Sequence, residues 1–376
     1  MRSPHTVALF LPLVTLCLGP SAGAGPLNPP TGAITSTAKP LAEIEPRTAI
    51  SAANTPGDAD SLFRITQPGS YYLTGNVNGV AGKVGIEIAA SGVTLDLNGF
   101  ELLGVPGSLS GTRPGANISN VTIKNGSARN WGEVGVSLAV FQVTGARIES
   151  VHASGNGGAG IFSGDGCVVT GCAASANAAS GIATGAACVV SGCVAYSNAG
   201  TGINASGGCH VVDCTSYSNA GTGISVGSGG TVSRCTVLAS GTYGIGTSSS
   251  CTVEGCTVRG SAQDGIRCAG SGSVIRDNVC AVNGSGGEGA GIVVVSVENK
   301  IEGNHCSNND RGIDVQVAGN FIVRNTCSDN TVQWVIVANN VYGPIINRSA
   351  PASAAVNGPA AASTLGSTDP HANFTY

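Results

Sequence analysis

Charged side chains are scarce in this chain. Asp, Glu, Lys and Arg together make up 10% of its 376 residues, and the formal net charge is −4. A chain without a basic face has no electrostatic means of attracting nucleic acid or an anionic membrane surface. We therefore expect neither as a partner. Lysine is especially rare and occurs only as Lys39, Lys83, Lys124 and Lys300.

Long apolar runs are also missing, except near the start. Arg2 and His5 precede the apolar run from Val7 to Leu18, and a small-residue A-x-A site ends at Ala24. This pattern predicts a signal peptide over residues 1–24, cleaved near Ala24. No later segment approaches the ~18 apolar residues of a membrane span. We expect a mature protein without a transmembrane segment that is secreted, extracellular or held at the cell surface.

Glycine is abundant, with 58 residues, and its spacing is regular. The dipeptide Gly-Ile recurs every 21 residues at Gly160-Ile161, Gly181-Ile182, Gly202-Ile203, Gly223-Ile224, Gly244-Ile245 and Gly265-Ile266. It returns at Gly291-Ile292 and Gly312-Ile313 after steps of 26 and 21 residues, and Gly135-Val136 and Gly85-Ile86 are looser copies. A fixed period of this kind is the signature of a repeat architecture.

Cysteine and asparagine follow the same period. One column is occupied by Cys172, Cys193, Cys214, Cys235 and Cys256 and then by Asn278, Asn304 and Asn325. A second contains Asn156, Asn177, Asn198, Asn219, Ser240, Ser261, Asn283, Asn309 and Asn330. A third begins with Cys167, Cys188 and Cys209, followed by Gly230 and Cys251. If the repeats stack, each buried amide donates to the next one, which offsets the ~1–3 kcal/mol cost of an unpaired buried polar group.

A period of 21 residues also equals three heptads, so a coiled coil must be considered. The unit from Cys188 to Gly208 contains five glycines, and each costs a helix ~1 kcal/mol relative to alanine. The unit also lacks a leucine seam. Three short strands joined by Gly and Asn corners fit better, because these residues tolerate left-handed turns. The sequence therefore predicts an all-β, single-stranded parallel β-helix, a solenoid of about eleven coils.

Two segments carry a family resemblance. Ser91 to Phe100 (SGVTLDLNGF) and Asn320 to Thr331 (NFIVRNTCSDNT) resemble repeats of right-handed parallel β-helix proteins of the pectin-lyase-like superfamily. The resemblance covers roughly residues 62–346 and implies an asparagine ladder. That superfamily includes lyases, hydrolases, epimerases, adhesins and phage spikes, so the resemblance is specific for the fold and weak for activity.

Four segments follow from these patterns. We predict a signal peptide over residues 1–24, a linker or N-terminal arm over 25–61, the β-helix over 62–346 and a low-complexity C-terminal tail over 347–376. An insertion near Asn283 to Glu288 widens one coil. Because function on repeat scaffolds concentrates in loops, the irregular coils at 100–135 and the widened coil at 283–290 are the places to look for chemistry. The regular middle, 151–270, is the least promising.

The cysteines have three interpretations. Outside the predicted signal peptide their number is odd, so at least one has no partner within the chain. An exported protein makes disulfides a natural expectation. Cysteines in register on successive coils, however, point the same way, which fits the S–S torsion poorly. A ladder of buried thiols acting as small apolar side chains is the favoured reading, disulfides are the alternative, and we expect no metal site.

Catalytic motifs of the superfamily are not found. The Asp-Asp and Gly-His-Gly motifs of its hydrolases do not occur, and Asp369-Pro370-His371 matches an epimerase motif only in part and in the tail. The catalytic candidates are Asp264, Arg267, Arg311 and Asp314, which flank two Gly-Ile pairs in the same register. Two coils separate them, or about 10 Å.

Two further sets of residues are considered as sites. Trp131 and Trp334 are candidates for stacking on a sugar ring. A charged series alternates largely in sign from coil to coil just before the Cys/Asn corner: Asp213, Arg234, Glu254, Arg276, Asp277, Glu302 and Arg324. Such a series is typical of a surface ion-pair ladder, in which each pair contributes at most ~1 kcal/mol.

The sequence supports two classes of function. The first is a secreted or surface-displayed β-helix protein with a structural, adhesive or glycan-binding role, whose partner is a polysaccharide or cell-surface glycan. The alternative is a polysaccharide-active enzyme, a lyase or glycoside hydrolase, so enzymatic activity stays open. No cofactor is expected, except Ca²⁺ under the lyase alternative. The sequence identifies neither the ligand nor the oligomeric state.

Overall fold

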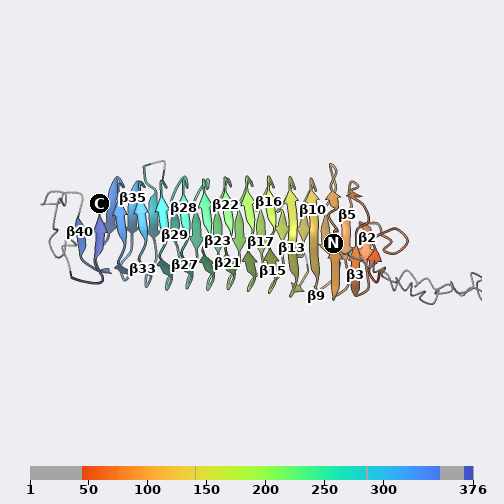
Figure 1. Cartoon of the computed structure of the whole chain (residues 1–376), viewed down its shortest axis with the longest axis horizontal. Helices are drawn as coiled ribbons and strands as arrows, with labels where there is room; N and C mark the ends of the chain where they lie inside the picture. The colour runs from red at the N-terminus through yellow and green to blue at the C-terminus, as the bar shows by residue number, and fades with distance from the viewer. Residues whose placement is uncertain (1–44, 140, 285–286, 348–367, 376) are drawn as a thin grey trace, which may run out of the picture. The chain divides into compact units, whose positions relative to one another are not determined.

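A computed structural model describes residues 45–139, 141–284, 287–347 and 368–375. These residues contain 41 β-strands and no helix. Every coil turns through three short strands, and successive coils stack strand upon strand in parallel (Figure 1). The predicted fold class, an all-β parallel β-helix, is confirmed.

One side of the stack is a sheet of 13 strands, to which each coil contributes one. This is slightly more than the expected number of about eleven coils. The strands are β2 (Ser61–Ile65), β5 (Val84–Ile88), β8 (Thr112–Pro114), β11 (Val136–Ser137), β14 (Ile161–Phe162), β17 (Ile182–Thr184), β20 (Ile203–Ala205), β23 (Ile224–Val226), β26 (Ile245–Thr247), β29 (Ile266–Cys268), β32 (Ala290–Val294), β35 (Arg311–Val315) and β38 (Val332–Ile336).

The other two sides form a 26-stranded sheet. Its second stack contains β3 (Gly69–Tyr72), β6 (Val93–Asp96), β15 (Val168–Thr170), β18 (Val189–Ser191), β21 (His210–Val212), β24 (Thr231–Ser233), β27 (Thr252–Glu254), β30 (Val274–Arg276), β33 (Lys300–Glu302), β36 (Phe321–Val323) and β39 (Val341–Tyr342). Its third stack contains β4 (Val77–Asn78), β7 (Glu101–Leu103), β16 (Ala173–Ser175), β19 (Val194–Tyr196), β22 (Thr215–Tyr217), β25 (Thr236–Leu238), β28 (Thr257–Arg259), β31 (Val279–Ala281), β34 (His305–Ser307), β37 (Thr326–Ser328), β41 (Asn373–Thr375) and β40 (Ile345–Asn347).

Four strands depart from this pattern. β10 (Thr122–Arg129) and β13 (Arg147–Ser154) run through the second and third stacks without a break. β9 (Ile118–Ser119) and β12 (Val143–Thr144) form a separate two-stranded sheet. These irregular strands belong to the wider N-terminal coils, as the sequence around residues 100–135 predicts.

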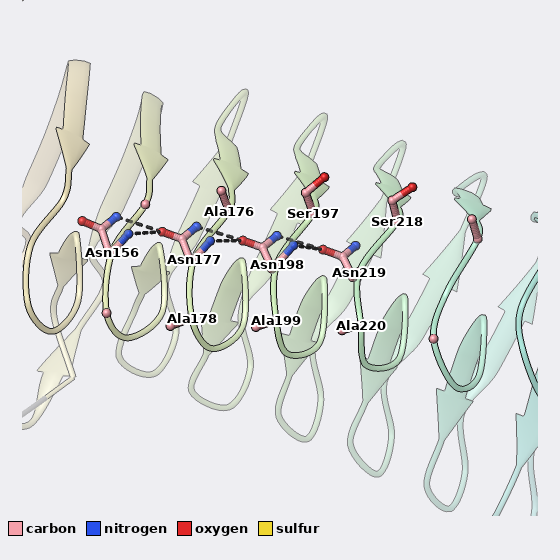
Figure 2. Close-up of a pocket in the computed structure, with 14 residues that line it drawn as sticks. Asn156, Ala176, Asn177, Ala178, Ser197, Asn198, Ala199, Ser218, Asn219 and Ala220 are labelled. Carbon is pink, nitrogen blue, oxygen red and sulfur yellow. Dashed lines mark hydrogen bonds between the residues drawn. The ribbon is translucent and has the colours of Figure 1, made fainter.

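The corners explain the sequence columns. At each corner a residue with positive φ, such as Ala176 (53°) or Ser197 (53°), turns the chain, and the next residue points its side chain inward. Asn177 Oδ1 accepts from Asn156 Nδ2 at 2.9 Å, and Asn198 Oδ1 accepts from Asn177 Nδ2 at the same distance (Figure 2). The same side-chain oxygens accept the backbone N–H of the preceding Asn at 3.1 Å. The predicted asparagine ladder is confirmed.

Most of the cysteines occupy equivalent corners, whereas Cys268, Cys280, Cys306 and Cys327 lie within strands. All cysteines of the described residues are buried and free. Cys188 Sγ accepts from Cys167 N at 3.3 Å, and Cys193 Sγ accepts from Cys172 N at 3.4 Å. At these two corners the thiol sulfur accepts the backbone N–H that an asparagine side-chain oxygen accepts at the asparagine corners. This is the thiol ladder that the sequence favoured, with an additional role as hydrogen-bond acceptor.

The glycine of each Gly-Ile pair is required by close packing. A Cβ at Gly181 would lie 2.6 Å from Asn198 Nδ2 and 2.8 Å from the carbonyl oxygen of Gly202. No side chain fits between coils at that distance. The isoleucine that follows fills the interior, as fully buried Ile182, Ile203 and their equivalents show.

Both ends of the β-helix extend beyond the predicted limits. β1 (Thr48–Ala49), within the predicted N-terminal arm, pairs with β3. β41, from the predicted C-terminal tail, lies between β37 and β40 and pairs with both. Asn373 Oδ1 accepts from Asn325 N at 2.9 Å, so this strand extends the Cys/Asn column to one more member. The predicted segment 1–24 lies outside the described residues.

Replacing a ladder asparagine should destabilise the stack. We expect Asn198→Ala to lower the free energy of unfolding by at least about 2 kcal/mol, because buried donors on Asn177 lose their acceptor. Urea denaturation followed by circular dichroism measures this. Ser197→Ala, at an exposed neighbouring position where the preceding coil already has Ala176, should change the free energy by less than about 0.5 kcal/mol. Equal effects of the two substitutions would contradict the ladder's role.

The buried thiols should be inert in the native protein. Burial raises the pKa of the Cys280 and Cys306 thiols well above the usual value, and the thiolate is the reactive form. We expect iodoacetamide to leave Cys280 and Cys306 unmodified in buffer and to alkylate both in denaturant. Mass spectrometry of the peptides reads out both states. Disulfide-linked peptides from the non-reduced protein would show that the thiol ladder is wrong.

Candidate functional site

The outward face of the 13-stranded sheet presents one residue from each coil in strict register. From Phe162 this column passes through Ala183, Asn204, Ser225 and Gly246, and then reaches Arg267, Val293 and Asp314. The middle positions are small and uncharged. Charge appears where the column meets the widened coil, which is where the sequence placed its catalytic candidates.

Asp264 and Arg267 form the first half of the cluster. Arg267 Nη1 donates to Asp264 Oδ2 at 3.3 Å, and the backbone N–H of Ala290 on the next coil donates to Asp264 Oδ1 at 3.0 Å. The guanidinium of Arg267 also lies 5.0 Å from the ring centroid of Tyr243. The Asp264 side chain is 9% exposed, whereas that of Arg267 is 33% exposed. A buried carboxylate is thus held beneath a half-exposed arginine.

Arg311 and Asp314 form the second half, two coils further on. Arg311 Nη1 donates to Asp314 Oδ2 at 2.8 Å, and Gln316 Nε2 donates to the same oxygen at 3.0 Å. The Asp314 side chain is only 2% exposed. Its other oxygen, Oδ1, is buried and has no hydrogen-bond partner. Such atoms are rare in folded proteins, because leaving a buried acceptor unpaired costs roughly 1–3 kcal/mol.

The widened coil borders the cluster. Asp310 Oδ2 accepts the backbone N–H of Gly287 at 2.8 Å and that of Gly289 at 3.3 Å. Beside it lies a cavity of about 350 Å³, lined by Ala262, Gln263, Asp264, Glu288 and Gly289. Asp264 therefore borders both the charged cluster and an open cavity.

The electrostatics of the cluster favour proton exchange at Asp264. Burial raises the pKa of this carboxyl above its usual value, while the hydrogen bond from Ala290 N and the charge of Arg267 oppose that rise. The negative charge of Asp314 raises the pKa of Asp264 a little further. Asp314, in turn, raises the pKa of Arg311 through their hydrogen bond. The cluster combines a carboxyl whose pKa is raised by burial with two arginine cations.

The structure thus brings all four catalytic candidates of the sequence into one cluster. It does not do the same for the two tryptophans. Trp131 is 1% exposed and donates from Nε1 to the carbonyl oxygen of Leu102 at 2.9 Å, so it fills the interior and has no face for a ligand. Trp334 takes the interior position of Ile313 on the next coil and donates to Thr375 Oγ1 at 3.3 Å. Its role is to close the C-terminal end, and stacking on a sugar is excluded for Trp131.

The second charged series is a surface ion-pair ladder, as predicted. Arg234 Nε lies 2.8 Å from Asp213 Oδ1, with both side chains more than half exposed. The pairs Arg276–Glu254 and Arg324–Glu302 repeat this arrangement on later coils. Exposed pairs of this kind contribute little to the free energy of folding.

Asp369 and His371 form the turn before β41, where the His371 carbonyl oxygen accepts from Arg324 N at 3.3 Å.

One charged group was missed. Glu87 on β5 is 8% exposed at its side chain and pairs with Arg64 at 2.9 Å and Arg113 at 3.2 Å. Glu87 directly follows Gly85-Ile86, a loose copy of the Gly-Ile repeat, so its position in the column could have been inferred from the sequence. The three residues lie in a single column of the sheet, and Asp58, 3.3 Å from Arg64, balances the second arginine.

An open groove lies in the regular middle, beside the asparagine ladder. It has a volume of about 770 Å³ and is lined by Gly, Ala, Ser and the ladder asparagines (Figure 2). The amides of Asn156, Asn177 and Asn198 are engaged within the ladder. This groove is therefore lined by small side chains and by amides that the ladder already engages.

Within the described residues no three His, Cys, Asp or Glu side chains are arranged to hold a metal ion. Those same residues contain no helix long and apolar enough to cross a membrane.

Comparison with known proteins identifies the family. The model of the right-handed β-helix region matches residues 75–215, 108–251 and 228–350. The chain therefore belongs to the right-handed β-helix family, and its fold is of the pectin-lyase-like type. No curated protein matches the chain in sequence.

Two solved structures share the fold. The A-module of mannuronan C-5 epimerase AlgE4 from Azotobacter vinelandii is 15% identical, with a TM-score of 0.56 over 73% of this chain and 91% of the module. The AlgE6 A-module from the same organism is also 15% identical, with a TM-score of 0.53 over 78% and 86%. At this identity the likeness concerns the fold alone.

Asp264 should behave as a functional rather than a stabilising residue. Its folded-state pKa is raised, so its contribution to stability is present below the unfolded pKa and is lost as pH rises through the folded value. Asp264→Asn keeps the acceptor for Ala290 N and removes the charge. We expect this variant to gain up to about 1 kcal/mol of unfolding free energy at neutral pH. Denaturation curves at several pH values test this, and a gain that shrinks with rising pH would contradict it.

Proposed function

We propose that this protein binds a polysaccharide along the outward face of its 13-stranded sheet, at the cluster of Asp264, Arg267, Arg311 and Asp314. The observation that carries the proposal is the unpaired Oδ1 of Asp314, buried in an outward-facing cluster. The fold gains nothing from this atom. Sugar hydroxyls both donate and accept hydrogen bonds, and the cluster offers carboxylate acceptors beside guanidinium donors.

The shape of the face also supports a chain-like ligand. The sheet surface that leads to Arg267 has small side chains, at Ala183, Ser225 and Gly246. The related epimerase modules bear names that state action on mannuronan, a polysaccharide. We extend only the class of ligand, a polysaccharide or cell-surface glycan, to this chain. Export after cleavage near Ala24 is part of the proposal, since such a ligand lies outside the cell.

A polysaccharide-active enzyme is the second candidate function. The raised pKa of Asp264 beside an open cavity favours it, because a carboxyl whose pKa is raised by burial keeps its proton to a higher pH than a free carboxyl and can donate it to a leaving oxygen. Under this alternative the protein is a lyase or a glycoside hydrolase. Ca²⁺ is implied only for the lyase, where a cation would stabilise a uronate carboxylate.

Binding to a panel of polysaccharides tests the proposal. We expect the mature protein to be retained by at least one polymer in affinity electrophoresis, and Arg311→Ala and Asp314→Asn each to weaken the interaction at least about tenfold, because hydrogen bonds to charged groups are lost. Arg234→Ala, which removes an exposed arginine of the ion-pair ladder, is the matched control and should bind as the wild type does.

The same panel separates the two functions. New reducing ends or unsaturated sugars that appear with the wild type and disappear with Asp264→Asn would establish the enzyme. Retention without turnover establishes the binding protein. If no polymer is retained or cleaved, or if Arg311→Ala binds unchanged, the proposal is wrong.

A further inference from the structure

A second cavity opens on the same face, far from the charged cluster. Its volume is about 280 Å³, and its lining includes Phe141, Phe162 and Asp165. Phe141 is 44% exposed and Phe162 is 38% exposed. Large apolar side chains in the core of this protein are almost fully buried, so two exposed phenylalanines around one cavity call for an explanation other than packing.

Phe162 lies in the same outward column as Arg267. The register runs from Phe162 through four intermediate positions to Arg267 without a break. Five coils separate the two residues, which corresponds to about 24 Å at ~4.8 Å per coil. The aromatic cavity and the charged cluster therefore mark two points on one straight track.

The track between them is flat and polar. Its four positions are Ala183, Asn204, Ser225 and Gly246, of which Asn204 is exposed and the others are half-buried. None carries a charge or a bulky side chain. An extended chain can lie along this surface without obstruction, and Asn204 provides a hydrogen-bonding group near its middle.

The chemistry of the cavity fits a sugar ring. One face of a pyranose exposes C–H groups, which pack against the face of an aromatic side chain, while its hydroxyls stay at the edge. Here the polar groups lie at the rim. The backbone N–H of Ala186 donates to Asp165 Oδ1 at 2.7 Å, which fixes this exposed carboxylate beside the phenylalanines.

We propose that Phe141 and Phe162 form an aromatic subsite for a pyranose ring of the same glycan chain that the charged cluster binds. This inference rests on the proposed function. The distance between the two sites makes binding depend on ligand length. A chain long enough to span them engages both, whereas a short fragment engages one. Joining two sites through one ligand raises the affinity through effective concentration, with no new contact in between.

The experiment uses fragments of the polymer retained by the wild-type protein, sorted by length, with affinity measured by calorimetry. We expect affinity to rise steeply once fragments span the track. In the variant Phe141→Ala/Phe162→Ala, long fragments should bind at least about tenfold more weakly, since an aromatic contact of this kind contributes on the order of one such factor. Short fragments that bind at the charged cluster should be unaffected.

Phe321→Ala is the matched control. Phe321 is 39% exposed but lies on β36, in the other sheet, so its loss should not alter binding. Circular dichroism and thermal denaturation check that each variant is folded. If long fragments bind the double variant as tightly as the wild type, while Arg311→Ala still abolishes binding, the aromatic subsite is wrong and the proposed function stands. If the wild type retains no polymer, both are wrong.

Discussion

The structure depends on a hydrogen bond that recurs at many of its corners. A residue with positive φ turns the chain, and the backbone N–H of the next residue is then satisfied by a side chain on the following coil rather than by a strand carbonyl. Asn177 N donates to Asn198 Oδ1, Cys172 N to Cys193 Sγ, and Cys251 N to Ser273 Oγ. Because the requirement is only for a small inward acceptor, asparagine, cysteine and serine exchange within a column. Such corners are the reason that so charge-poor a chain forms one regular stack.

This constraint also decides where the chain can vary. The ladders hold the corners in register, so a long insertion fits between a ladder residue and the next strand. The widened coil follows that rule, since it opens after Asn283, whose Oδ1 accepts from Ser261 N, and closes at β32. The insertion therefore emerges beside the 13-stranded sheet. Asp264 and Asp314 flank it, and the corner chemistry thus fixes the position of the candidate site.

The repeat period determines how much of the fold and of the candidate site could be predicted from the sequence. Asp264, Arg267, Arg311 and Asp314 were found because a constant step converts sequence distance into register. Register can no longer be inferred where the number of residues per coil changes. Trp131 belongs to the wider N-terminal coils, whose interior volume the sequence does not reveal, and there it fills the core. Asn373 joins the Cys/Asn column 48 residues after Asn325, a separation that no period links. Phe141 lies in an irregular coil, so only the structure places it beside Phe162.

The two charged series of this protein differ in how their charges are paired and buried, and this difference favours the cluster over the ladder as a candidate site. In the ladder each arginine pairs with a carboxylate on the preceding coil and is itself about half exposed or more, and Arg234 engages Asp213 through two nitrogens. Its charges satisfy one another and stay in water. In the cluster each arginine pairs with an aspartate of its own coil, and both carboxylates are buried. At the Asp314 position the neighbouring coils have the uncharged residues Val293 and Val335. Stacking does not require these carboxylates, and burial makes them costly. A costly arrangement that the fold can do without is best explained by a ligand.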